Sequence, residues 1–102
     1  SLPQPMKTSD VASRAVLFTK RNCPPCTETK EFALGLENDL LTHLSFMDKD
    51  YHSALVAAYD LKLYPTLLII DKDGLEVQKI IGGKVVREQL VNVLNTIKAN
   101  KE

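Results

Sequence analysis

Residues 15–27 read AVLFTKRNCPPCT and hold the chain's only two cysteines, Cys23 and Cys26, between an apolar run and a helical pattern. The apolar residues 15–19 predict a buried strand, and the residues after Cys23 predict a helix. A thiol at a helix start faces unpaired backbone donors and the positive end of the helix dipole. Both favour the thiolate, so Cys23, expected to be exposed at the helix start, is the predicted nucleophile, and Cys26, one turn inward, is the predicted resolving cysteine.

Pro24 and Pro25 should stiffen this first turn without breaking it, because its N–H groups lack intrahelical partners, and so hold the two sulfurs near bonding geometry. Three other uses of the cysteines stay open. A zinc site would need two further ligands, and His43 and His52 lack the spacing of a zinc-finger pair. A structural disulfide would close too short a loop to stabilise much, while an iron–sulfur cluster shared between subunits would need only one thiolate from each. We expect a redox-active disulfide and no metal.

Length and composition favour a single domain. Of the 102 residues, 44% are hydrophobic and 25% are charged, which suits one compact domain over residues 11–102. Residues 1–10 are expected to be disordered or vector-derived, with Met6 as the natural start. The 13 basic and 13 acidic residues cancel, which favours neither nucleic acid nor an anionic membrane as partner. We expect a soluble cytoplasmic monomer, with an oxidising compartment still open because a trimmed signal peptide would look similar.

The remaining sequence alternates strand and helix patterns in the order βαβαββα. Strands are predicted at residues 15–19, 44–47, 66–70 and 76–81, and helices at residues 24–38, 51–59 and 85–99. The first helix has Phe32 and Leu34 among its apolar positions, and Asp50 is the expected cap of the second. The turn signal at residues 71–74 predicts that the last two strands form an antiparallel hairpin.

Three features together resemble the thioredoxin superfamily, and the resemblance spans residues 15–98. The cysteine motif looks like its active site, Tyr64-Pro65-Thr66 looks like its cis-proline loop, and Gly82-Gly83 looks like the glycine pair that closes its substrate groove. The resemblance implies the thioredoxin fold, an α/β fold with a central mixed four-stranded sheet flanked by helices. It also implies that Pro65 is cis and lies near Cys23, and that the backbone of Tyr64 pairs with a bound peptide.

Within the superfamily the signals divide. The residues before Cys23 are similar to glutaredoxins, and Lys20 occupies the place of a lysine that contacts the thiolate or glutathione. Lys84 and Val85, however, replace the small or acidic residues that follow the glycine pair in glutaredoxins. The second half is similar to thioredoxins, but Asn22 replaces their tryptophan and Leu17 replaces the buried aspartate that accepts a proton. Proton handling must therefore differ, with water as an alternative acceptor.

The resemblance implies a dithiol oxidoreductase that reduces disulfides in proteins. Cys23 would attack a substrate sulfur, and Cys26 would then displace the reduced substrate to leave the Cys23–Cys26 disulfide. No bound cofactor is expected. Electrons would come from thioredoxin reductase or glutathione, and ribonucleotide reductase is one candidate acceptor. Two alternatives stay open: a disulfide oxidase or isomerase in an oxidising compartment, and a non-catalytic interaction module with the same fold.

Overall fold

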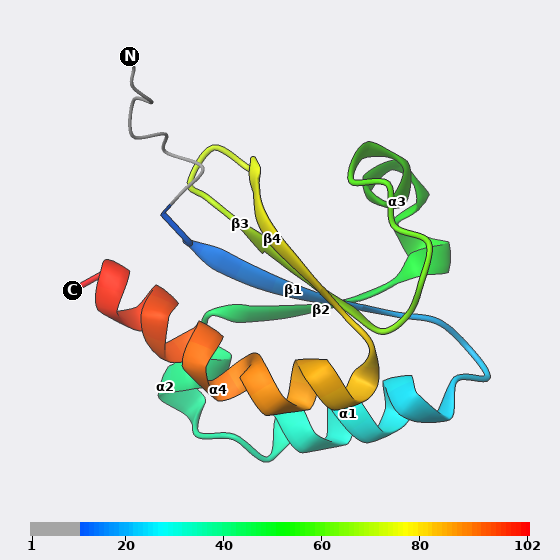
Figure 1. The fold of residues 1–102 in the computed structure, drawn as a ribbon, viewed down its shortest axis with the longest axis horizontal. Coiled ribbons are helices and arrows are strands. Elements are labelled where there is room, and N and C mark those ends of the chain that lie inside the picture. Colours follow the sequence, from blue (N-terminus) through cyan, green and yellow to red (C-terminus); the bar gives the residue numbers. More distant parts are fainter. Residues whose placement is uncertain (1–10) are drawn as a thin grey trace.

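A mixed sheet of four strands forms the centre of the molecule. The computed structural model describes residues 11–102, so the expectation for residues 1–10 lies outside the described residues. The strands are β1 (Arg14–Thr19), β2 (Leu44–Asp48), β3 (Thr66–Ile70) and β4 (Glu76–Ile81), in the sheet order β2-β1-β3-β4. The helices are α1 (Pro24–Leu34), α2 (Asn38–Leu41), α3 (Ser53–Ala58) and α4 (Gly83–Asn100), with a 3₁₀ turn, η2, at Lys49–Tyr51. The predicted βαβαββα order is confirmed, with α2 and η2 as short additions (Figure 1).

The pairing of the strands brings the ends of three of them to one edge of the sheet. β1 pairs in parallel with β2, opposing Leu17 to Phe46, and antiparallel with β3, opposing Leu17 to Leu67. β3 pairs antiparallel with β4, as predicted. The carboxyl ends of β1 and β4 therefore lie beside the start of β3, and the cysteines, the Tyr64-Pro65 segment and the glycine pair meet there.

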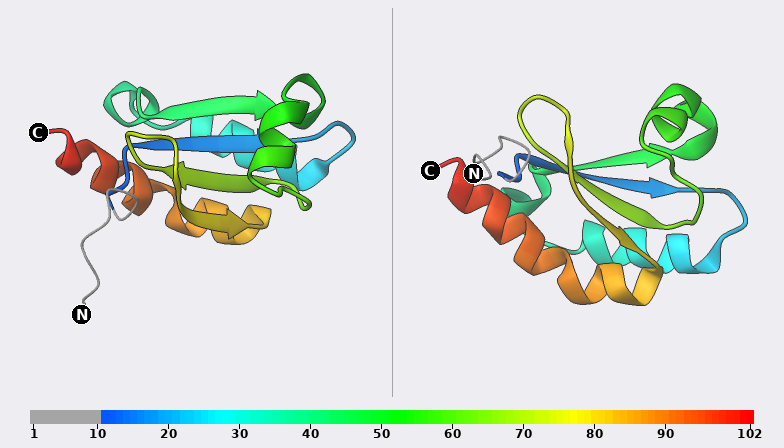
Figure 2. Two further views of the ribbon diagram at one scale, coloured as in Figure 1. Left: turned by 90° about the horizontal axis from the view of Figure 1, so that it is seen from above. Right: turned by 45° about the horizontal axis from the view of Figure 1, so that its top comes forward.

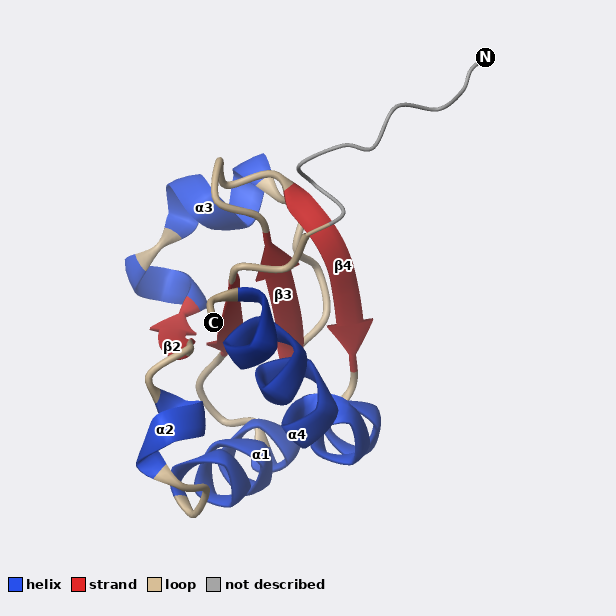
Figure 3. Cartoon of the chain, turned by 90° about the vertical axis from the view of Figure 1, so that its left-hand side faces the viewer, coloured by secondary structure: helices blue, strands red, loops and turns tan. Residues whose placement is uncertain are grey.

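Helices cover both faces of the sheet. α1, α2 and α4 lie on one face and α3 lies on the other (Figures 2 and 3). Alternate residues of β1 enter the two cores: Leu17 packs with the residues of α4, and Phe18 packs on the side of α3. Burial on both faces explains why residues 15–18 of β1 and residues 67–70 of β3 are apolar without a break.

The first helix is shorter than predicted. α1 ends at Leu34 rather than near residue 38, and the chain turns at Gly35, whose N–H donates to the Phe32 carbonyl at 3.2 Å. Glycine disfavours helix continuation by about 1 kcal/mol relative to alanine. Phe32 and Leu34 are exposed, and the buried residues of α1 are Cys26, Thr29 and Ala33. The two large apolar residues of this helix therefore do not mark its buried face.

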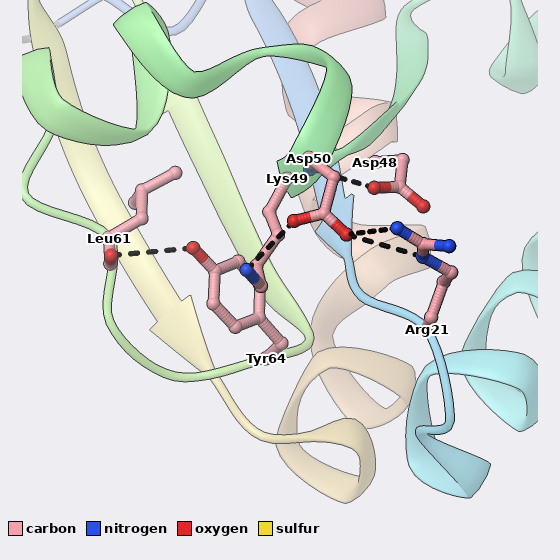
Figure 4. Close-up of polar contacts among 6 residues, drawn as sticks. All are labelled: Arg21, Asp48, Lys49, Asp50, Leu61 and Tyr64. Atoms are coloured by element: carbon pink, nitrogen blue, oxygen red, sulfur yellow. Dashed lines mark hydrogen bonds and ion pairs between the residues drawn. The ribbon is translucent and has the colours of Figure 1, made fainter.

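The start of the second helix was also predicted wrongly. Residues 49–51 form η2, and α3 begins at Ser53. Asp50 is not the cap; the carboxylate of Asp48 accepts the N–H of Asp50 at 2.8 Å and caps η2 (Figure 4). An aspartate binds most readily the backbone two residues ahead, and Asp48, at the end of β2, is the residue so placed.

The hairpin and the last helix agree with the sequence prediction. The carboxylate of Asp71 closes the turn between β3 and β4 by accepting the N–H groups of Asp73 and Leu75 at 2.8 and 2.9 Å. α4 starts at Gly83, two residues earlier than predicted, and buries Val86, Leu90, Leu94 and Ile97. Within residues 11–102, no helix is long and apolar enough to cross a membrane.

Candidate active site

Cys23 and Cys26 form a disulfide at the start of α1. Cys23 is the N-cap residue, and its sulfur accepts a hydrogen bond from the Cys26 N–H at 3.2 Å. Asn22, directly before it, has a left-handed backbone with φ 54°, which asparagine tolerates better than most residues. When the disulfide is reduced, the same N–H can donate to a thiolate on Cys23, which favours the charged form.

Cys23 is less accessible than the sequence suggested. Its exposed fraction is 7%, against 3% for Cys26, so both cysteines are buried and Cys23 is only slightly the more open. The expectation of an exposed Cys23 was wrong because the segment before β3 lies over it: the Cys23 sulfur is 4.0 Å from the carbonyl oxygen of Tyr64. The order of exposure, with Cys26 the deeper of the two, still agrees with the predicted roles.

The Tyr64-Pro65 peptide bond is cis, as expected, and Pro65 is buried. Thr66 begins β3 opposite Ile81, and its buried hydroxyl donates to the Leu63 carbonyl at 2.6 Å. The hydroxyl group of Thr66 therefore holds the loop before β3. The Gly82 N–H donates to the Pro65 carbonyl at 2.9 Å, which ties the end of β4 to this loop.

The two glycines have different surroundings. Gly82 has φ 102°, a conformation that L side chains rarely adopt, and a Cβ built on it would meet nothing within 4 Å. Gly83 is buried, and a Cβ there would lie 3.0 Å from both Thr29 Oγ1 and Arg87 Nη1 and 3.2 Å from Pro25 Cβ. Gly82 thus faces open space, whereas Gly83 lets the starts of α1 and α4 approach each other.

Arg21, two residues before Cys23, is paired with a carboxylate of η2. Arg21 donates to the Asp50 carboxylate from two nitrogens at 3.3 Å, and Lys49 donates to it at 3.0 Å (Figure 4). The hydrogen bond from Lys49, with a smaller contribution from Arg21, lowers the pKa of Asp50 below its ordinary value. Lys20 is exposed and forms no hydrogen bond or ion pair with another residue of the described range. The structure therefore does not bring Lys20 into contact with Cys23.

Sequence reasoning missed two residues behind the cysteines. Thr29 is fully buried on α1, and Arg87 on α4 donates to its hydroxyl oxygen at 3.1 Å. Leu17, at the position where the resemblance places an aspartate, is fully buried, and the buried acid of residues 11–102 is Asp71, which follows β3 at the opposite edge of the sheet. A threonine three residues after Cys26, on the same face of a helix, was the available signal for Thr29. Arg87 carried none, because its partner is 58 residues away.

Metal ligation finds no support in this part of the chain. Among residues 11–102, no group of three or more histidine, cysteine, aspartate or glutamate side chains could hold a metal ion.

Comparison with solved structures identifies similar folds. The chain superposes on a thioredoxin of Malassezia sympodialis with a TM-score of 0.70 and 14% identity, covering 89% of this chain and 79% of that one. The superposition on the germline-specific thioredoxin Deadhead of Drosophila melanogaster has a TM-score of 0.68 and 17% identity, and it covers 86% of this chain and 83% of that one. The superposition on a thioredoxin h of poplar has a TM-score of 0.66 and 22% identity, and it covers 84% of this chain and 79% of that one. No protein-family model and no curated protein sequence matches the chain.

Proposed function

This chain has the thioredoxin fold, and from that fold and its cysteine pair we propose that it is a thiol–disulfide oxidoreductase that reduces disulfides in proteins. One observation carries the proposal. The Cys23 sulfur lies at the start of α1, where it accepts the Cys26 N–H at 3.2 Å, and it faces the Tyr64 carbonyl at 4.0 Å. A sulfur so placed has help in forming the thiolate and has a strand-like backbone beside it to align a substrate.

The proposed reaction is two successive thiol–disulfide exchanges. The Cys23 thiolate attacks one sulfur of the substrate disulfide, whose S–S bond breaks, and the other substrate sulfur leaves as a thiolate and takes a proton from water. Cys26, after losing its proton, attacks the Cys23 sulfur of the mixed disulfide and releases the second substrate thiolate. The Cys23–Cys26 pair loses two electrons, and the substrate disulfide gains them.

The surface around the sulfurs supports a protein substrate. Three apolar residues at the same edge of the sheet are exposed: Leu63 by 62%, Ile81 by 46% and Val85 by 40%. Each is within three residues of the cis-proline or the glycine pair. An extended peptide laid between the Tyr64 backbone and the open side of Gly82 would cover part of this surface. Apolar area removed from water would stabilise such a complex by about 25 cal/mol per Å².

The electron donor and the location are further parts of the proposal. No bound cofactor is needed, because the disulfide itself carries the electrons, and thioredoxin reductase or glutathione would restore the dithiol. Lys20 does not contact Cys23 in the disulfide-bonded structure, but its side chain is exposed and not engaged by another described residue. We propose that it contacts the thiolate or glutathione after reduction. We propose a cytoplasmic monomer, with ribonucleotide reductase as one candidate acceptor.

The test is turnover of a disulfide-bonded protein such as insulin, with dithiothreitol as the electron source. The wild-type protein should accelerate reduction, and Cys23→Ser should abolish the acceleration. Cys26→Ser should instead accumulate a mixed disulfide between Cys23 and the substrate, because the resolving thiol is missing. If the wild-type protein gives no acceleration and Cys26→Ser traps no protein, the chain is a non-catalytic interaction module rather than an oxidoreductase.

A further inference from the structure

We propose that Arg87, acting through the hydroxyl group of Thr29, favours the thiolate of Cys26 and so assists the resolving step. The role in the resolving step rests on the proposed function, but the effect on the Cys26 thiolate can be tested without it. Arg87 is a positioning residue in this account, because it contacts Thr29 and neither sulfur. The inference is carried by the burial of Cys26 and by the hydrogen bond between α4 and the buried face of α1. It is also carried by the place of the buried acid of residues 11–102, Asp71, which lies at the opposite edge of the sheet.

Cys26 must ionise in a place that disfavours charge. Its exposed fraction is 3%, and burial in apolar surroundings resists thiolate formation. In the described range the buried polar or charged residues are Thr29, Thr66 and Asp71. Asp71 follows β3 at the opposite edge of the sheet, and the Thr66 hydroxyl is engaged by Leu63. Thr29 is therefore the one buried polar side chain on the helix that carries Cys26.

Thr29 lies between Cys26 and Arg87. Cys26 and Thr29 are both buried residues of α1, and helical residues three apart are neighbours with Cβ atoms about 5–6 Å apart. Arg87 Nη1 donates to Thr29 Oγ1 at 3.1 Å. The Thr29 hydroxyl thus uses its oxygen as an acceptor, and no hydrogen bond donated by it is formed within residues 11–102. Its proton is available to a thiolate on Cys26.

The packing of the two helices fixes this arrangement. α1 and α4 start side by side (Figures 1 and 2), and Gly83 leaves just enough room for Thr29 and Arg87 to meet. Hydrogen bonding to a cation polarises the Thr29 hydroxyl and strengthens it as a donor. A hydroxyl donor lowers the free energy of the thiolate relative to the thiol, and the positive charge of Arg87 acts in the same direction.

Other charges around the cysteine pair are less suited to this role. On α1, Glu28 lies 3.8 Å from Arg87 and is 67% exposed, so it weakens the charge of Arg87 without cancelling it at the buried side. On α4, Lys84 is exposed, as is Lys20 on the loop after β1, and Arg21 on that loop is paired with Asp50. The segment before β3 presents Tyr64 to Cys23, and its charged residues Asp60 and Lys62 are exposed and paired with each other. Arg87 is the cation hydrogen-bonded to the buried face of α1.

The resolving step then needs no internal base. The Cys26 S–H bond breaks and its proton goes to water, while the Thr29 hydroxyl donates to the sulfur that remains. Cys26 attacks the Cys23 sulfur, the bond from Cys23 to the substrate breaks, and the substrate leaves as a thiolate that is protonated by water. One disulfide forms as the other is consumed, so electrons balance without a further reactant.

Titration of Cys26 in the Cys23→Ser protein tests the inference directly. Thiolate formation is followed against pH by ultraviolet absorbance, which requires no turnover and is therefore independent of whether the chain reduces proteins. Arg87→Gln should lower the thiolate fraction at a pH below the midpoint by about threefold, a modest effect because Arg87 is partly exposed and acts through Thr29. Thr29→Val, which removes the hydroxyl group at similar side-chain volume, should also lower the thiolate fraction of Cys26.

Matched variants separate charge from packing. Arg87→Lys keeps the charge and should retain most of the effect, and Thr29→Ser keeps the hydroxyl and should titrate like the parent. Lys84→Gln removes a cation from the same helix that is not hydrogen-bonded to Thr29, and it should leave the Cys26 titration unchanged. The inference is overturned if Arg87→Gln and Thr29→Val both titrate like the parent, or if Lys84→Gln shifts Cys26 as far as Arg87→Gln does.

Discussion

Gly83 and Thr29 approach so closely that a Cβ on the glycine would lie 3.0 Å from the threonine Oγ1. One residue belongs to α4 and the other to α1, so this approach sets how the two helices meet behind the cysteines. A side chain at position 83 would push against the short side chains of Thr29 and Pro25 on α1 and against the guanidinium group of Arg87 on α4. The glycine pair of the sequence therefore has one member that serves helix packing and one, Gly82, that faces open space.

Gly83→Ala should destabilise the protein by about 1–2 kcal/mol. Overpacking of this kind costs about 1–3 kcal/mol, and the better helix propensity of alanine offsets part of it. Urea unfolding measures the change. Gly35→Ala is the matched control, because a Cβ at Gly35 meets its nearest neighbours at 3.5 and 3.9 Å, which is ordinary contact. Equal stabilities for the two variants would show that α1 and α4 are less tightly packed than described.

Asp71→Ala should lower the free energy of unfolding by about 1–3 kcal/mol, because it leaves two backbone N–H groups of the β3–β4 turn without their acceptor. Those groups belong to Asp73 and Leu75. The comparison is with Asp73→Ala, whose carboxylate is exposed and paired with Lys72 only. That variant should stay within about 0.5 kcal/mol of the parent. If both variants lost the same free energy of unfolding, the carboxylate of Asp71 would not be the acceptor that holds this turn.

Asp39 and Lys98 join α2 to α4 by an exposed ion pair, and they predict a pH dependence of stability. The hydrogen bond from Lys98 lowers the pKa of Asp39, and that same bond raises the pKa of Lys98. Asp39 therefore adds to the free energy of unfolding above its ordinary pKa of 3.8, and this stabilisation is lost as the pH falls through its lowered folded-state pKa. Lys98 adds to the free energy of unfolding below its ordinary pKa of 10.5, and this stabilisation is lost as the pH rises through its raised folded-state pKa.

Asp39→Asn should therefore reduce the urea midpoint by the same small amount across neutral pH, and the difference from the parent should vanish in acid. Lys101→Gln, which removes an exposed charge near the end of α4, serves as the control. Its difference in urea midpoint from the parent should not vanish in acid. For Asp39→Asn, a difference that persists below the lowered pKa of Asp39 would mean that the substitution acts through packing rather than charge.

Lys20→Gln and Arg21→Gln should affect the Cys23 thiolate differently. Arg21 is held by Asp50 at 3.3 Å, so its charge is already neutralised locally, whereas Lys20 is exposed and unengaged by the described residues. If Lys20 contacts the thiolate as proposed, its substitution should slow alkylation of Cys23 by iodoacetamide about twofold near neutral pH. Arg21→Gln should leave the rate unchanged, and identical rates for both variants would remove Lys20 from the site.

The strands and their order along the chain could be predicted because their signals are local. Residues 66–70 and 76–81 were predicted with the observed bounds, since an apolar run, a turn signal and a glycine pair mark their ends. The buried face of α1 could not be predicted from the apolar residues, because it includes Cys26 and Thr29, whereas Phe32 and Leu34 are exposed. Which side of a helix is buried depends on what the rest of the chain places against it.

The candidate site divides in the same way. The positions of Cys23, Cys26 and the cis bond before Pro65 followed from motif and order, and the structure agrees. The depth of Cys23 did not follow, because it depends on the Tyr64 segment, 41 residues away, lying over the sulfur. Arg87 was missed for the same reason, since long-range contacts between surface-type residues leave no periodic signal.

The reduction potential of the Cys23–Cys26 pair, measured by equilibration with glutathione or thioredoxin buffers, tests the central claim most directly. A pair that reduces protein disulfides in a reducing compartment should have a potential near or below about −230 mV. A value near or above about −180 mV would contradict the account, because such a pair would donate its disulfide, and the chain would then act as an oxidase or isomerase.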